Sequence, residues 1–193
     1  LSEHISSTTI HPDGQMVADE RVKGGVLAGS FNPIHEGHQK LANCASKILG
    51  ENVTYELSIT NVDKPTLEES EIRKRIGQFS KISTVAITRA SVFSEKARLF
   101  PGCTFVIGWD TAVRLVNPRY YAKSEIKMLN DLKEIDNLEC KFLVAGRMEE
   151  GVFHTLDDIA MPPTLIHMFS QIPEDAFRHD LSSTELRLVD ENS

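Results

Sequence analysis

The sequence predicts an α/β protein, a three-layer sandwich built on a central, mainly parallel sheet of five or six strands. Short apolar segments that suit strands alternate along the chain with longer segments whose apolar residues recur at helical spacing. The strand segments are apolar nearly throughout, which is typical of parallel strands whose two faces are both covered. Together these patterns favour right-handed strand–helix–strand connections within one sheet.

The predicted elements follow one another in a regular order. Strands are expected over 25–28, 52–60, 85–87, 103–107, 140–145 and 164–169. The helix after the first strand carries an apolar stripe at helical spacing. That stripe consists of Leu41, Ala42, Ala45, Ile48 and Leu49. A second helix is expected over about 67–81, where Glu69–Arg73 and Glu71–Arg75 pair four residues apart on a solvated face.

The simplest division of the chain is a flexible lead-in followed by a single domain. Residues 1–22 are polar and contain the turn signal Pro12-Asp13-Gly14, so we expect a flexible segment there. Residues 23–193 then form one domain with enough length to bury a sizeable core. The expected sheet is Rossmann-like, and in such sheets ligands bind beyond the carboxyl ends of the strands, where the strand order reverses.

Composition narrows the class of ligand. The net charge of -7 argues against a general nucleic-acid-binding surface, so we expect a small ligand and no nucleic acid. No apolar stretch approaches the length that spans a bilayer, which argues against a membrane protein. The scattered cysteines Cys44, Cys103 and Cys140 predict reduced, buried thiols and a cytoplasmic location. A homo-oligomer is compatible with this composition.

The most informative segment is Gly29 to His38, which places two imidazoles three residues apart where a buried strand becomes a helix. Gly29 lets backbone approach a ligand, and Pro33 stiffens the turn. The start of the helix presents N–H groups and a positive dipole end to an anion. Two plainer interpretations remain open: His35 and His38 cap the helix, or they form half of a zinc site.

This segment resembles the GxFxPxHxGH signature of the nucleotidyltransferase superfamily related to class I aminoacyl-tRNA synthetases. All six fixed positions of the signature are present between Gly29 and His38. The resemblance implies that His35 and His38 contact the phosphates of a nucleoside triphosphate. It also implies nucleotide contacts from the loop residues Gly29, Ser30, Phe31 and Asn32.

Two later segments resemble nicotinate and nicotinamide mononucleotide adenylyltransferases. In the segment from Asn61 to Pro65, Lys64 matches a lysine that contacts phosphate, although Asp63 stands where the family usually has His. Lys64 could equally be an ordinary surface lysine. Gly108 and Asp110 match a Gly-x-Asp in which Gly packs against the nucleoside and Asp binds a sugar hydroxyl. The plainer role for Asp110 is to cap a helix that begins at Thr111.

The aromatic residues near the expected acceptor differ from the family pattern. Tyr120 and Tyr121 lie where these adenylyltransferases carry a tryptophan that stacks on the pyridine ring, which leaves the acceptor open. Trp109 either stacks on a ring of the ligand or packs as a wall of its loop. Arg147 resembles an arginine directed at the site from the end of the fifth strand, and it could instead pair with Glu149 or Glu150.

The segment from Leu181 to Arg187 resembles the second signature of the family, (I/L)SSTxxR. Hydroxyl and N–H groups at a helix start, with an arginine one turn later, form a clamp for the β and γ phosphates. The resemblance assigns this clamp to Ser182, Ser183, Thr184 and Arg187. A capping box made by Ser182 and Glu185 is the alternative interpretation.

The resemblance implies transfer of AMP from ATP to a phosphate on a small acceptor, with release of pyrophosphate. Nicotinate or nicotinamide mononucleotide is the leading acceptor, and Mg²⁺ held mainly by phosphate oxygens and water completes the neutralisation of charge. Phosphopantetheine as acceptor or CTP as donor remains an alternative on the same fold. A module that binds nucleotide without chemistry is the third possibility.

Overall fold

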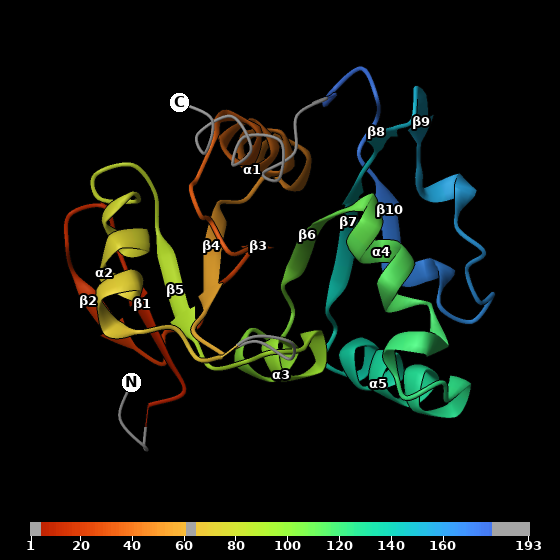
Figure 1. The fold of residues 1–193 in the computed structure, drawn as a ribbon, viewed down its shortest axis with the longest axis horizontal. Coiled ribbons are helices and arrows are strands. Elements are labelled where there is room, and N and C mark those ends of the chain that lie inside the picture. The colour runs from red at the N-terminus through yellow and green to blue at the C-terminus, as the bar shows by residue number, and fades with distance from the viewer. Residues whose placement is uncertain (1–4, 61–64, 179–193) are drawn as a thin grey trace.

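The computed structural model describes residues 5–60 and 65–178 and confirms a Rossmann-like α/β fold. Its main sheet has eight strands in the order β10-β7-β6-β3-β4-β5-β1-β2 (Figure 1). The strands are β1 Ser7–Ile10, β2 Met16–Ala18, β3 Gly25–Ala28, β4 Val53–Ser58, β5 Val85–Thr88, β6 Thr104–Gly108, β7 Lys141–Ala145 and β10 Phe169–Gln171. The pairs from β10 to β5 are parallel, and β1 and β2 add an antiparallel edge.

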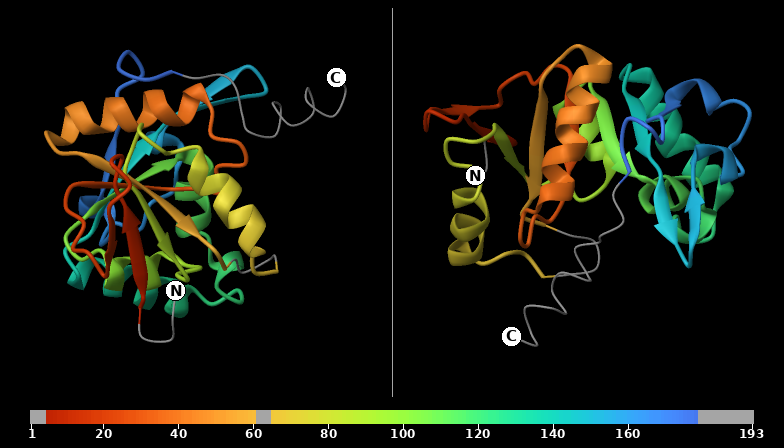
Figure 2. Two further views of the ribbon diagram at one scale, coloured as in Figure 1. Left: turned by 90° about the vertical axis from the view of Figure 1, so that its left-hand side faces the viewer. Right: turned by 90° about the horizontal axis from the view of Figure 1, so that it is seen from above.

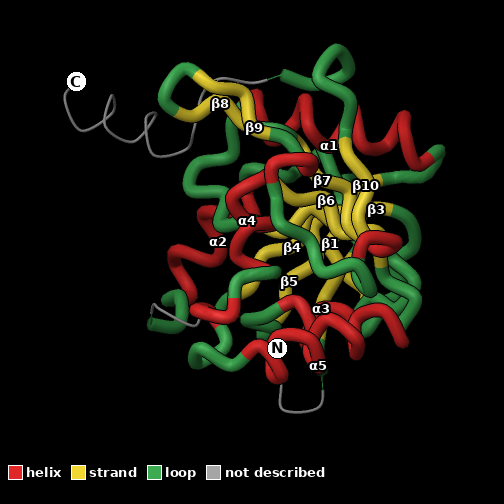
Figure 3. The backbone as a smooth tube through the Cα atoms, turned by 90° about the vertical axis from the view of Figure 1, so that its right-hand side faces the viewer, coloured by secondary structure: helices red, strands yellow, loops and turns green. Residues whose placement is uncertain are grey.

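Helices cover both faces of this sheet (Figure 2, Figure 3). The helices are α1 Glu36–Leu49, α2 Glu69–Gly77, α3 Phe93–Leu99, α4 Trp109–Leu115 and α5 Glu125–Asn137, and short 3-10 helices lie at Pro118–Tyr120, Leu156–Asp158 and Ile166–Met168. A separate two-stranded sheet pairs β8 Arg147–Glu149 with β9 Val152–His154. Within α2, the ion pairs Glu69–Arg73 and Glu71–Arg75 form as expected.

The expectation of a flexible lead-in over residues 1–22 is wrong for residues 7–18. The β1–β2 hairpin adds to the edge of the main sheet, because β1 pairs antiparallel with β5. Ser7 and Thr9 are buried, and Asp19 accepts the backbone N–H groups of Ser6 and Ser7 at 2.9 and 2.8 Å. Because backbone pairing stabilises this hairpin, it does not need the apolar alternation by which a strand is recognised in a sequence.

Two other expectations also change. The sixth strand was expected over 164–169, but the chain forms the 3-10 helix Ile166–Met168 first, and β10 pairs with β7 only from Phe169 onward. In α1, Leu41, Ala42 and Ala45 are buried as expected, whereas Ile48 is exposed. The sheet has more strands than the five or six expected because the edge hairpin extends it.

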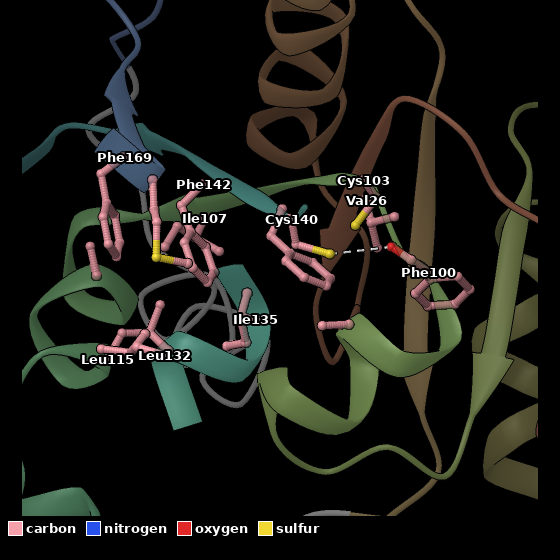
Figure 4. Packing of buried hydrophobic residues seen from close by; sticks show 14 of the residues in the cluster. Val26, Phe100, Cys103, Ile107, Leu115, Leu132, Ile135, Cys140, Phe142 and Phe169 are labelled. Carbon is pink, nitrogen blue, oxygen red and sulfur yellow. Dashed lines mark hydrogen bonds between the residues drawn. The ribbon is translucent and has the colours of Figure 1, made fainter. Parts of the chain in front are cut away.

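The core consists of two apolar clusters, one on each face of the sheet. One joins α3, α4 and α5 to strand residues such as Val26, Ile107 and Phe142 (Figure 4). The other joins α1 and α2 to the alternate strand residues, including Leu27, Val106 and Leu143. The period of two along each parallel strand therefore divides its apolar residues between two helical layers.

The cysteines are free in the structure, as expected, and two of them belong to the core. Cys103 and Cys140 are buried in the first cluster, where the Cys140 thiol donates to the carbonyl of Phe100 at 3.4 Å (Figure 4). The hydrogen bond with Cys140, together with burial, raises the pKa of the Cys103 thiol. This thiol is therefore protonated and unreactive at neutral pH.

The loop after β3 packs so closely that Gly29 tolerates no side chain. A Cβ at Gly29 would lie 2.7 Å from the ring of Phe31, which is itself buried. We expect Gly29→Ala to lower the free energy of unfolding by about 1–3 kcal/mol, the usual cost of overpacking a core. Chemical denaturation measures this change.

Gly77, the last residue of α2, is the matched control, because a Cβ there meets nothing within 4 Å. Gly77→Ala should leave stability unchanged or raise it by up to about 1 kcal/mol. Equal effects of the two substitutions would show that the contact with Phe31 does not constrain the loop.

Candidate active site

The Gly29–His38 segment lies at the carboxyl end of β3, where the strand order reverses. From β3 the chain proceeds to β4 and β5 on one side, and then crosses to β6 and β7 on the other side. Crevices at such reversals are where open α/β sheets bind their ligands. The segment links the end of β3 at Ala28 to the start of α1 at Glu36.

The two histidines form the first turn of α1. His35 is the N-cap residue, and its backbone N–H donates to Nδ1 of His38 at 3.3 Å. The two rings overlap, with centroids 3.7 Å apart. A neutral imidazole whose Nδ1 accepts a hydrogen bond carries its proton on Nε2. The capping role is therefore real, and it also fixes His38 in the tautomer that donates from Nε2.

The side chain of Phe31 anchors the histidine loop in the core. Its side chain is buried, with ring centroids 5.1 Å from His38, 5.3 Å from Tyr55 and 5.3 Å from Phe79. The expectation that Phe31 contacts the nucleotide is therefore wrong for its side chain. Gly29 is required because the Phe31 ring occupies the space of a Cβ, a different reason from the ligand approach inferred from sequence.

Two residues near the end of α2 hold this loop, and neither was among the predicted site residues. Gln78 accepts the backbone N–H of Ile34 at 2.9 Å and donates to the carbonyl of Phe31 at 3.0 Å. Arg75 donates to the carbonyl of Ser30 at 3.0 Å. Because these bonds join main-chain groups to distant side chains, nothing local in the sequence marks them.

Asp110 and Arg147 come together at the ends of β6 and β7, where they form an ion pair. Their side chains are 32% and 41% exposed, so both are accessible to a ligand. Arg147 therefore forms its ion pair with Asp110 and with neither of the alternatives Glu149 and Glu150. Helix α4 begins at Trp109 with the exposed Gly108 as its N-cap residue, so Asp110 lies inside the first turn and is not the cap.

Trp109 packs as a wall of this region. Its ring stacks on His154 of β9, with centroids 4.6 Å apart and an interplanar angle of 23°. The indole Nε1 is buried and has no hydrogen-bond partner among the described residues. His154 therefore covers one face of the only tryptophan, which supports the second of the two roles considered for it.

The structure does not bring the two tyrosines together as a stacking platform. Tyr121 packs against the first core cluster, and its hydroxyl donates to the carbonyl of Leu115 at 3.0 Å. Burial and the neighbouring Asp131 raise the pKa of Tyr121 to about 12. Tyr121 is therefore partly buried against the core, whereas Tyr120 is exposed and lies beneath the guanidinium of Arg114.

A cavity of about 490 Å³ opens beside the histidine loop. The ends of β3 and β4, the segment after β5, and helices α2, α3 and α4 line it. Among its lining residues are Ser30 and Asn32, which were expected at the site, and Glu56, Phe93 and Lys96, which were not. Its volume suits a small ligand.

The remaining predicted site residues, Lys64, Ser182, Ser183, Thr184 and Arg187, lie outside the described residues. Within residues 5–60 and 65–178, no three His, Cys, Asp or Glu side chains gather as a metal site. The same part of the chain contains no helix long and apolar enough to cross a membrane.

Comparison with known proteins assigns the family. No curated protein matches the chain. The sequence model of the cytidylyltransferase-like family matches residues 26–189, from β3 through the SSTxxR segment. This family supports a nucleotidyltransferase activity in general, in agreement with histidines that begin a helix at the reversal of strand order. Because the match covers most of its length, the chain belongs to the cytidylyltransferase-like family.

Proposed function

We propose that the protein transfers AMP from ATP to the phosphate of a small acceptor, with nicotinate or nicotinamide mononucleotide as the leading acceptor. The observation that carries this proposal is the paired imidazoles at the start of α1, with His38 held as an Nε2–H donor. A donor at a helix N-terminus is suited to a phosphate whose negative charge increases as the reaction proceeds. The resemblance of the SSTxxR segment to adenylyltransferases favours ATP as the donor.

The reaction needs no nucleophile from the protein. An oxygen of the acceptor phosphate attacks the α-phosphorus of ATP, and the bond to the bridging oxygen breaks as pyrophosphate leaves. Positioning and charge stabilisation then supply the catalysis, each worth several kcal/mol. In this proposal His38 donates to the α-phosphate, and His35 contacts the neighbouring phosphates.

Asp110 binds the ribose of the nucleotide in the same scheme. A carboxylate accepts hydrogen bonds from two sugar hydroxyls, and the ion pair with Arg147 holds it in place. Departing pyrophosphate would be held by Ser183, Thr184 and Arg187, and Lys64 would add a positive charge. Those four assignments rest on the resemblance.

Mg²⁺ fits this arrangement as an ion held by the triphosphate. The described residues offer no acidic cluster that would bind it alone, and Mg²⁺ characteristically keeps water and substrate phosphates as ligands. When bound, it would neutralise charge on the phosphates.

The proposal predicts pyrophosphate release when the protein is incubated with Mg-ATP and a mononucleotide, and a dinucleotide product detectable by mass spectrometry. Mg-CTP as donor and phosphopantetheine as acceptor are the parallel reactions. Product formed with CTP but not with ATP would contradict the choice of donor. Product formed only when phosphopantetheine is the acceptor would contradict the choice of acceptor. Nucleotide binding without any pyrophosphate release would show a binding module.

A second prediction separates the capping role of His38 from its proposed chemical role. Asparagine keeps an acceptor near the position of Nδ1 but lacks the Nε2–H donor. His38→Asn should therefore change the free energy of unfolding by less than about 1 kcal/mol. It should lower kcat by about 10²–10³-fold, the usual cost of removing a transition-state donor.

Steady-state kinetics and chemical denaturation measure the two effects. His167→Asn is the control, because His167 is exposed and pairs with Asp136 on α5, away from the loop. Normal turnover by a folded His38→Asn variant would remove His38 from the chemistry.

A further inference from the structure

A buried ion pair lines the cavity beside the histidine loop. The ammonium of Lys96 on α3 lies 2.7 Å from a carboxylate oxygen of Glu56 on β4. Their side chains are only 7% and 1% exposed, yet both residues line the cavity. Neither belongs to a sequence motif, and the proposed reaction uses neither.

The hydrogen bonds of this pair leave part of its capacity for a ligand. Glu56 Oε1 accepts from the hydroxyl of Thr88 at 2.5 Å, and Lys96 also donates to the carbonyl of Ala90 at 2.8 Å. An ammonium has three N–H donors, and a carboxylate has about four acceptor positions. Within the described part of the chain, two donors of Lys96 and two acceptor positions of Glu56 are used.

Stability alone is a weak reason for these charges. Burying an ion pair costs about as much in desolvation as the attraction returns, and apolar residues of similar volume often serve equally well. Here the pair borders open volume, where its remaining donor and acceptor can be satisfied by a bound molecule. A ligand group that fits must both accept and donate hydrogen bonds.

Charge divides the cavity into two parts. Glu56 and Lys96 are both buried and cancel each other, whereas Arg75 and Arg114 also line the cavity and lie closer to solvent. The arginines suit the phosphate of an acceptor, and the neutral pair suits an uncharged polar group. Phe93 adds an aromatic ring to the lining.

We propose that Glu56 and Lys96 bind a primary carboxamide on the ring of the acceptor, and so select nicotinamide mononucleotide over nicotinate mononucleotide. The inference rests on the proposed function, because it takes this cavity as the acceptor site. The amide oxygen accepts from Lys96, and the amide nitrogen donates to Glu56. A ring carboxylate has no donor for Glu56 and brings a second negative charge beside it.

Binding to the wild-type protein without ATP is the first test. Isothermal titration compares nicotinamide mononucleotide, nicotinate mononucleotide and ribose 5-phosphate, which lacks the ring. We expect the amide to bind at least about tenfold more tightly than the carboxylate, because the carboxylate leaves a buried acceptor unpaired. Equal or tighter binding of the carboxylate would overturn the proposal.

The second test neutralises both members of the pair, so that neither charge is left buried alone. The double variant Glu56→Gln, Lys96→Met keeps an acceptor for Thr88. It should lose about tenfold or more in affinity for the amide and bind ribose 5-phosphate as the wild type does. The double variant Arg98→Met, Glu134→Gln removes an exposed ion pair that also involves α3, and it should change neither affinity.

Thermal melting establishes which variants are folded. If the folded Glu56→Gln, Lys96→Met variant still prefers the amide, the proposal is contradicted. It is also contradicted if this variant loses as much affinity for ribose 5-phosphate as for the amide. If that variant does not fold, the wild-type preference decides. Selective amide binding without pyrophosphate release would uphold this inference and refute the proposed transfer. Pyrophosphate release without amide preference would uphold the proposed transfer and refute this inference.

Discussion

The buried ring of Phe31 is the constraint on which the candidate site depends. Its backbone adopts a positive φ of 44°, which directs its side chain into the core between Tyr55 and Phe79. A non-glycine residue adopts this conformation only where its surroundings compensate for the strain. Burial of the ring provides that compensation, and the rest of the loop follows from it. His38 packs edge-on against the same ring.

Several separate interactions converge on this loop. Gln78 and Arg75 reach it from the far end of α2, and the hydroxyl of Tyr55 lies 3.5 Å from the carbonyl of His38. The loop is therefore tied to β4 and α2 as well as to its own helix. Such a rigid support is what a site needs when its chemistry is positioning of phosphates and not covalent catalysis.

The loop also stands between two chemically different regions. On the side of β6 and β7, Asp110 of α4 forms an accessible ion pair with Arg147 at the start of β8, and His154 of β9 covers Trp109. On the side of β4 and β5, the cavity is lined by the buried pair of Glu56 and Lys96. A nucleotide on the first side and an acceptor on the second would meet at Ser30 and Asn32, which line the cavity.

The sequence predicted those parts of the fold that depend on apolar periodicity. Alternation along 52–60 located β4, and the junction at Gly29–His38 was correctly placed at a strand end. The β1–β2 hairpin was missed because Ser and Thr strands are stabilised by backbone pairing at an edge. The partial burial of Tyr121 was missed because its place against the core depends on the turn that follows α4.

The same limit applies to the buried charges. Glu56 is the only charged residue of β4, which is the one local signal that it needs a partner. That partner, Lys96, lies forty residues away on α3, and only the sheet order brings the two together. A sequence pattern can therefore indicate each such residue separately, but it cannot show that the two residues form a pair.

The role of the two histidines is tested most directly by following the histidine ring resonances while ATP is added. His35 and His38 should shift saturably, and the Nε2 proton of His38 should become protected from exchange, as in a hydrogen bond to phosphate. His11 and His167, which pair with Glu20 and Asp136 away from the loop, should not shift. Saturable ATP binding that leaves both resonances unchanged would show that His35 and His38 do not contact the phosphates.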